Sequence, residues 1–177
     1  MADDKEQFRR LIPKGNGGRI SSPGHECNSS AAGEVGVCGT AFFLDFAPPE
    51  ARAINIEAIC AFITLRDQAK PALPQLQTLM ESTNSDIALH AMLASCGTGS
   101  NAIPLLLNGL TNQFADVRNE AANYVTQNFS NQFLGRRDQV IPLFVKLLND
   151  SYNDVRMNAT NELKQIDAAA ALKAGVK

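Results

Sequence analysis

Residues 72–163 contain a pattern that repeats three times, and this repeat constrains the fold more than any other feature. In each copy an Asp follows a proline by twelve residues, a branched aliphatic residue follows the Asp directly, and an alanine stands five residues beyond the Asp. The prolines are Pro74, Pro104 and Pro142, the aspartates Asp86, Asp116 and Asp154, the aliphatic residues Ile87, Val117 and Val155, and the alanines Ala91, Ala121 and Ala159. A register kept through three copies indicates one structural unit used repeatedly.

Each copy has the pattern of a helical hairpin. A proline near the start of the first helix costs little, because the N–H groups of a first turn have no intrahelical partner. Asp116 and Asp154 stand where the N-cap of the second helix belongs. Val117, Ala121 and Val125 then form an apolar stripe at helical spacing, in which the alanine lets the two helices approach closely. One hairpin cannot bury its apolar face alone, so neighbouring hairpins must stack.

The repeated segments resemble a known family. IPLLLNGL followed by ADVRNEAANYV, and IPLFVKLL followed by NDVRMNATNEL, are similar to HEAT repeats. The resemblance covers about residues 71–167, and Ile54–Arg66 resembles the second helix of a decayed fourth unit. The C-terminal text LKQIDAAAALKAGVK is similar to the end of bacterial, particularly verrucomicrobial-type, HEAT-repeat proteins. The units are expected at about 71–101, 102–138 and 139–168.

The expected fold is therefore all-α, a short α-solenoid of about three to three and a half HEAT-type hairpins over residues 48–177. The resemblance also implies a structural ladder between adjacent repeats, formed by the Asp and Arg of the signature. These residues are Asp116, Arg118, Asp154 and Arg156. Ala88 occupies the Arg position of the first unit, which indicates that the ladder ends there or that this unit is the edge of the array.

Residues 1–47 form a separate N-terminal segment with a different composition. Seven of the twelve glycines lie between Gly15 and Gly39, in a stretch without apolar period that is expected to be loop or disorder. Asp3–Ile12 before it can form one short helix. Ala41–Phe46, AFFLDF, is either a strand or an apolar plug over a helical surface.

Charge excludes two classes of partner. Sixteen Lys and Arg oppose eighteen Asp and Glu, so the net charge is -2, and neither half of the chain is biased. Nucleic-acid binding and membrane-surface binding both rely on basic patches. The chain has neither an N-terminal apolar run of signal-peptide length nor an apolar stretch of membrane-spanning length. We therefore expect a cytoplasmic protein whose partner is another protein, with no nucleic acid and no membrane segment.

The cysteines and histidines give no sign of a metal or cofactor. Cys60 and Cys96 lie within apolar helical patterns, where a buried thiol is expected. His25, Cys27 and Cys38 supply three possible zinc ligands, but the fourth is missing and the spacing matches no common site. We expect no metal and no cofactor.

Local nucleophilic catalysis is also not expected. Asp86 and His90 are four residues apart and can share a helix face, whereas Cys96 falls on the other side of the helix.

Three enzyme classes with HEAT-like architecture have site residues or surfaces that can be looked for in the sequence. Deoxyhypusine hydroxylase uses several His-Glu pairs for two irons, and here only His25-Glu26 exists. HEAT-like DNA glycosylases need a basic surface, which the charge balance excludes. Bilin lyases stay open as an alternative. The chain is predicted to be a non-catalytic scaffold and not an enzyme, with an accessory lyase or a fragment of a longer repeat protein as alternatives.

The resemblance places the partner site on the second helices, which line the concave face of HEAT arrays. Their exposed positions are rich in amides, which can hydrogen-bond an extended peptide. The candidate residues are Asn119, Asn123, Gln127, Met157, Asn158 and Asn161. The alternative is a solvated helix face in an Asn-rich protein.

Overall fold

The computed structural model describes residues 59–176. The expectations for residues 1–47, including the helix at Asp3–Ile12, the Gly-rich segment and the apolar segment Ala41–Phe46, lie outside the described residues. Residues 59–65 are helical. The α-helices that follow are α3 (Leu73–Met80), α4 (Ser85–Cys96), α5 (Ile103–Gly109), α6 (Ala115–Gln127), α7 (Arg137–Leu147), α8 (Asn153–Ile166) and α9 (Ala168–Lys173). Shorter helical segments join them, namely η3 (Arg66–Ala72), η4 (Gly99–Ala102), η5 (Phe129–Phe133) and η6 (Leu134–Arg136).

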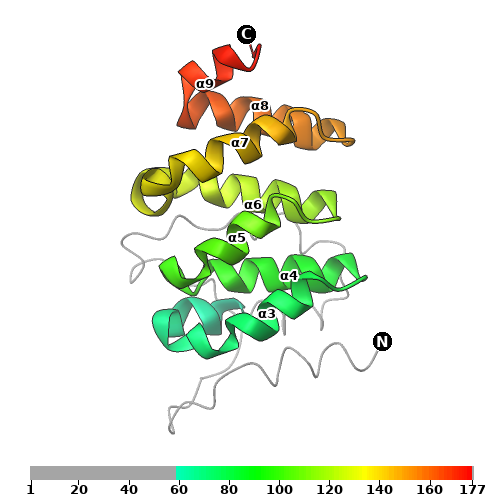
Figure 1. Ribbon diagram of the computed structural model, residues 1–177. Coiled ribbons are helices and arrows are strands. Elements are labelled where there is room, and N and C mark those ends of the chain that lie inside the picture. Colours follow the sequence, from blue (N-terminus) through cyan, green and yellow to red (C-terminus); the bar gives the residue numbers. More distant parts are fainter. Residues whose placement is uncertain (1–58, 177) are drawn as a thin grey trace, which may run out of the picture.

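The helices form two layers of stacked hairpins. Figure 1 shows α3, α5 and α7 on one side of the molecule and α4, α6 and α8 on the other. Contacts between hairpins run mainly through the second layer, where α4 packs on α6 and α6 packs on α8. No strand occurs among residues 59–176. The expected all-α solenoid of helical hairpins is confirmed.

The repeated alanines lie where the two helices of a hairpin meet. Ala91 and Ala121 are 0% exposed and Ala159 is 1% exposed. A Cβ placed on Gly109 of α5 would lie only 2.8 Å from the Ala121 Cβ of α6. The small residues therefore allow α5 and α6 to touch almost backbone to backbone, as the apolar stripe predicted.

Pro142 does not occupy the position that the repeat pattern predicts. Pro74 and Pro104 lie in the first turns of α3 and α5, where a missing N–H costs little. Pro142 lies inside α7, which begins five residues earlier at Arg137. The third hairpin therefore has a longer first helix than the other two and loses one backbone hydrogen bond within it.

The expected N-caps at Asp116 and Asp154 are wrong by two residues. Phe114 and Tyr152 are the N-cap residues of α6 and α8, and neither provides a side-chain cap. Asp116 and Asp154 instead lie in the first turns of these helices, where a carboxylate is favoured by the helix dipole. A side-chain cap exists on α4, where Asn84 Oδ1 accepts the N–H groups of Asp86 and Ile87.

Both ends of the described array are closed by further helices. At the N-terminal end a Cβ on Gly97 would lie 2.5 Å from the backbone nitrogen of Ile63, so the end of α4 contacts the backbone of helix 59–65 directly. This helix takes the place expected for the second helix of a fourth unit, of which residues 54–58 lie outside the described part. At the C-terminal end α9 packs on α8 and buries Ala171.

Candidate functional site

The amide residues proposed from the sequence come together on the face of α6 and α8. Asn158 Nδ2 donates to Asn119 Oδ1 at 3.4 Å, which joins the two hairpins. Within α6, Gln127 Nε2 donates to Asn123 Oδ1 at 2.8 Å. Gln127, Asn158 and Asn161 are exposed, whereas Asn119 and Asn123 are half-buried. We call these five residues the amide stripe.

Met157, the remaining candidate, is 53% exposed on α8. A large apolar side chain with this exposure is available for contact with another molecule. It is the apolar member of an otherwise polar set of candidates.

Two carboxyl groups in the same layer are buried and were not among the residues predicted from the sequence. Glu120 of α6 is 4% exposed and Glu162 of α8 is 9% exposed. One oxygen of each, Oε2, is buried without a hydrogen-bond partner in the described part of the chain. We call Glu120 and Glu162 the carboxyl pair. Buried polar atoms without partners are rare in folded proteins and require an explanation.

Burial makes the carboxyl pair hard to ionise. Burial, together with the negative charge of Asp116, raises the pKa of Glu120 to about 7. Burial, together with the negative charge of Glu120, raises the pKa of Glu162 to about 8, although the neighbouring Thr126 hydroxyl acts in the opposite direction. The effect of the Glu120 charge on Glu162 indicates that the two groups are close across the contact between α6 and α8. Near neutral pH the pair therefore holds protons that ordinary glutamates would release.

The repeat alignment contained a signal for Glu162. It stands eight residues after Asp154, the position that Tyr124 occupies after Asp116 in the preceding unit. Tyr124 is 2% exposed, and its hydroxyl donates to the carbonyl oxygen of Cys96 at 3.0 Å. A glutamate at a position that is buried in the neighbouring repeat is a candidate for a buried carboxyl.

The inter-repeat connection implied by the family resemblance exists, but its acidic residue is Asp150. Arg118 Nε donates to Asp150 Oδ2 at 2.7 Å and Arg118 Nη2 donates to Asp150 Oδ1 at 2.7 Å. Both side chains are only 9% exposed. Asp116 and Asp154, which the resemblance assigned to the ladder, are exposed and form no ion pair within the described residues. Asp150 lies in the turn before α8, beside the preceding hairpin, which carries Arg118.

Arg118 also holds the turn of its own hairpin. Its Nη1 donates to the carbonyl oxygens of Asn112 at 2.8 Å and Gln113 at 3.0 Å. Arg156 repeats part of this pattern, with Nη1 donating to the carbonyl oxygen of Asp150 at 2.7 Å. Burial acts to raise the pKa of Asp150, but hydrogen bonds from Arg118 and from the Tyr152 N–H outweigh it and hold that pKa below its usual value.

Neutral amides connect the first and second hairpins. Asn112 Nδ2 donates to the carbonyl oxygen of Met80 at 2.9 Å, and Gln113 Nε2 donates to the carbonyl oxygen of Ser82 at 2.9 Å. The first unit has Ala88 where the later units have arginine, so it offers no guanidinium for this connection. The charged link is therefore replaced at this junction by two neutral hydrogen bonds.

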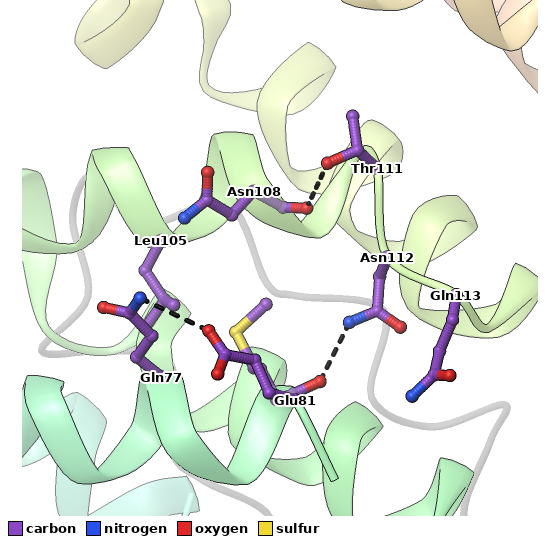
Figure 2. Close-up of a pocket in the computed structure, with 8 residues that line it drawn as sticks. Gln77, Glu81, Leu105, Asn108, Thr111, Asn112 and Gln113 are labelled. Carbon is purple, nitrogen blue, oxygen red and sulfur yellow. Dashed lines mark hydrogen bonds between the residues drawn. The ribbon is translucent and has the colours of Figure 1, made fainter. Parts of the chain in front are cut away.

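A polar groove lies on the opposite layer, where α3 ends beside α5. Figure 2 shows the side chains that line it, including Gln77, Asn108 and Gln113. Its volume is about 330 Å³. Gln77 Nε2 donates to Glu81 Oε1 at 3.4 Å across its floor. The groove is open to solvent, and two of its four amide side chains, Asn112 and Gln113, already form hydrogen bonds between the hairpins.

The remaining candidate groups have structural surroundings. His90 Nδ1 lies 2.6 Å from the carbonyl oxygen of Asp86, and burial lowers its pKa. Cys96 is a buried thiol, as expected, and its Sγ lies 3.5 Å from the carbonyl oxygen of Met92. Cys60 is disulfide-bonded, so the expected buried thiol is wrong at this position. His25, Cys27 and Cys38 lie outside the described residues.

Two further features of the described residues bear on the expectations. Their His, Cys, Asp and Glu side chains do not gather into groups of three or more that could hold a metal ion. Their helices are each too short or too polar to cross a lipid bilayer.

Comparison with known proteins agrees with the architecture. No curated protein and no solved structure matches the chain. The family model of the HEAT repeat matches residues 140–167, which cover most of α7 and all of α8. The third hairpin, which carries Asn158, Asn161 and Glu162, is therefore similar to a HEAT repeat.

Proposed function

We propose that this chain is a non-catalytic scaffold that binds an extended segment of a partner protein along the amide stripe. HEAT repeats serve mostly as protein-interaction elements, and the third hairpin matches that family. The observation that carries the proposal is the hydrogen bond between Asn158 and Asn119, since it makes amides from two separate repeats into one continuous surface.

Amide side chains suit the backbone of an extended peptide. Each carries two N–H donors and an oxygen acceptor, so an amide that bonds its neighbour keeps further donor and acceptor capacity. A peptide backbone offers an N–H and a carbonyl oxygen at every residue and needs both kinds of partner. The exposed Met157 adds an apolar contact beside the stripe. The stripe lies beside Asp116 and Asp154, which favours a protein over a polyanion such as nucleic acid.

The proposal is tested by replacing four amides of the stripe with alanine. The variant Asn119→Ala, Asn123→Ala, Asn158→Ala, Asn161→Ala is expected to lose the partner proteins that the wild-type chain recovers from the host lysate. The matched control replaces amides of the polar groove on the opposite layer, Gln77→Ala and Asn108→Ala, and is expected to recover them normally. Equal recovery by the stripe variant and the wild type, with both folded by circular dichroism, would end the proposal.

A further inference from the structure

The α6–α8 face has an acidic character that the amide stripe alone does not explain. Asp116 and Asp154 are exposed at its N-terminal end and form no ion pair within the described residues. The carboxyl pair lies within the same face, because Glu120 is one turn from Asp116 and from Asn123, and Glu162 is one turn from Asn158.

The basic side chains of this layer point elsewhere. The charged and titratable groups of the layer are Asp86, His90 and Cys96 on α4, Asp116, Arg118, Glu120 and Tyr124 on α6, and Asp154, Arg156, Glu162 and Lys164 on α8. Arg118 donates to the Asp150 side chain, and Arg156 donates to the Asp150 carbonyl oxygen. Lys164 is exposed and follows Glu162 by two residues, which places it on the other side of the helix. His90 is neutral near pH 7, since burial lowers its pKa.

The layer of first helices supplies no cation either. α5 has no charged residue. On α7, Arg137 is paired with Asp167, and Lys146 is exposed in the last turn. α9, which packs on α8, carries Lys173, which is exposed in its last turn. The ion pairs within residues 59–176 join Arg118 to Asp150 and Arg137 to Asp167, so the unpartnered Oε2 atoms of Glu120 and Glu162 have no cation from this part of the chain.

We propose that the segment bound along the amide stripe carries a lysine or arginine whose cationic group binds between Glu120 and Glu162. This inference rests on the proposed function and specifies the chemistry of the partner. An unpaired carboxylate in a buried position is costly, whereas a carboxylate paired with a cation and hydrogen-bonded is not. Glu120 is one helical turn from Asn123 and Glu162 is one turn from Asn158, so a ligand that lies along the stripe lies next to the positions of both glutamates.

Binding of the cation releases protons. In the unbound protein the carboxyl pair is largely protonated below pH 7, because burial raises both pKa values. An ammonium or guanidinium group placed between the two carboxyls favours their ionised form. Each ionised carboxyl gives its proton to the solvent, and a carboxylate–cation hydrogen bond replaces the neutral acid. Binding of a Lys- or Arg-containing peptide at pH 6.5 is therefore accompanied by the release of protons. Binding of a peptide without a cationic side chain releases none.

The test uses immobilised short peptides with randomised flanks and one fixed central residue, which is Lys, Arg, Gln or Glu. Lys- and Arg-centred peptides are expected to bind at least about tenfold more tightly than Gln-centred ones. For the best Lys-centred peptide, calorimetry at pH 6.5 in two buffers of different ionisation enthalpy is expected to show proton release. The variant Glu120→Gln, Glu162→Gln keeps the shape of the site and is expected to lose both the preference and the proton release.

The matched control removes two exposed carboxylates from the opposite layer, Glu81→Gln and Asp138→Asn, and is expected to keep both effects. The inference is overturned if Gln-centred peptides bind as tightly as Lys-centred ones, or if the preference for Lys survives in the glutamine variant. If Gln-centred binding still requires Asn119 and Asn158, the proposed function stands without the inference. If peptide binding depends neither on the charge of the central residue nor on Asn119 and Asn158, both the inference and the proposed function are overturned.

Discussion

Replacing Arg118 with alanine is expected to weaken the junction between the second and third hairpins more than any exposed substitution. The guanidinium makes two hydrogen bonds of 2.7 Å to Asp150 and two more, of 2.8 and 3.0 Å, to backbone carbonyls. Both charged side chains are 9% exposed, so the surviving Asp150 would be left buried without its cation. Removing one partner of such a pair costs about 3 to 5 kcal/mol.

That loss is large for a chain of this size. Domains are typically stable by about 5 to 15 kcal/mol, so the variant is expected to keep its fold with a much reduced margin. A change of 1 kcal/mol corresponds to about 4 °C in melting temperature for chains of this length, which predicts a decrease of about 10 to 20 °C. Urea unfolding followed by circular dichroism measures the free energy directly, and a thermal scan measures the shift.

Two controls distinguish the effect of breaking the Arg118–Asp150 pair from the general effect of removing an arginine side chain. Arg156→Ala removes hydrogen bonds to the Asp150 carbonyl and to Asn153, with no ion pair in the described part, and is expected to cost only about 1 kcal/mol. A double-mutant cycle of Arg118→Ala with Asp150→Ala is expected to give a coupling energy of about 1.5 to 3 kcal/mol. A cost below about 1 kcal/mol for Arg118→Ala, or the same cost for both arginines, would refute the role of the buried pair.

Three further outcomes follow from the structure. Because the folded-state pKa values of Glu120 and Glu162 are raised to about 7 and about 8, the folded state binds more protons than the unfolded state at pH values between about 5 and 8. Wild-type stability measured by urea unfolding should therefore fall as pH rises from about 5 to about 8, by on the order of 6 kcal/mol, and Glu120→Gln, Glu162→Gln should remove most of this pH dependence. Gly109→Ala places a Cβ 2.8 Å from that of Ala121 and should lower the free energy of unfolding by about 1 to 3 kcal/mol, with partial recovery in Gly109→Ala, Ala121→Gly; an unchanged melting temperature would contradict this contact. Arg66 has a φ of 47°, so Arg66→Gly should raise the free energy of unfolding by about 0.5 to 1 kcal/mol, and a decrease would show that its side chain is needed.

Local sequence rules account for the hairpins but not for all of their boundaries. Helical periodicity predicted the buried positions Val117, Ala121 and Val125, because a helix places every third or fourth residue on one face whatever its neighbours are. The N-caps were misplaced because Asn112 and Asp150 accept the N–H groups of Phe114 and Tyr152 in the turns, and the helices begin one residue later.

Helix periodicity and capping patterns could not identify Asp150 as the partner of Arg118. The family resemblance assigned the ladder to Asp116 and Asp154, which lie in the first turns of α6 and α8. Asp150 lies in the turn before α8, and the resemblance gave that turn no role. Which acid meets the guanidinium depends on how far one hairpin is displaced along the next. That displacement is set by packing between α6 and α8, and it is not encoded in either segment separately.

The sequence by itself determined that this chain forms stacked helical hairpins, and it placed amide residues on the second helices, because period and composition act within each segment. Only the tertiary structure decided that Asn119 meets Asn158 and that Glu120 and Glu162 are buried near each other. A glutamate on a helix is exposed or buried according to the neighbour that covers it. The chemistry of the α6–α8 face therefore arises from the stacking of repeats, since burial and electrostatic coupling are properties of pairs of helices.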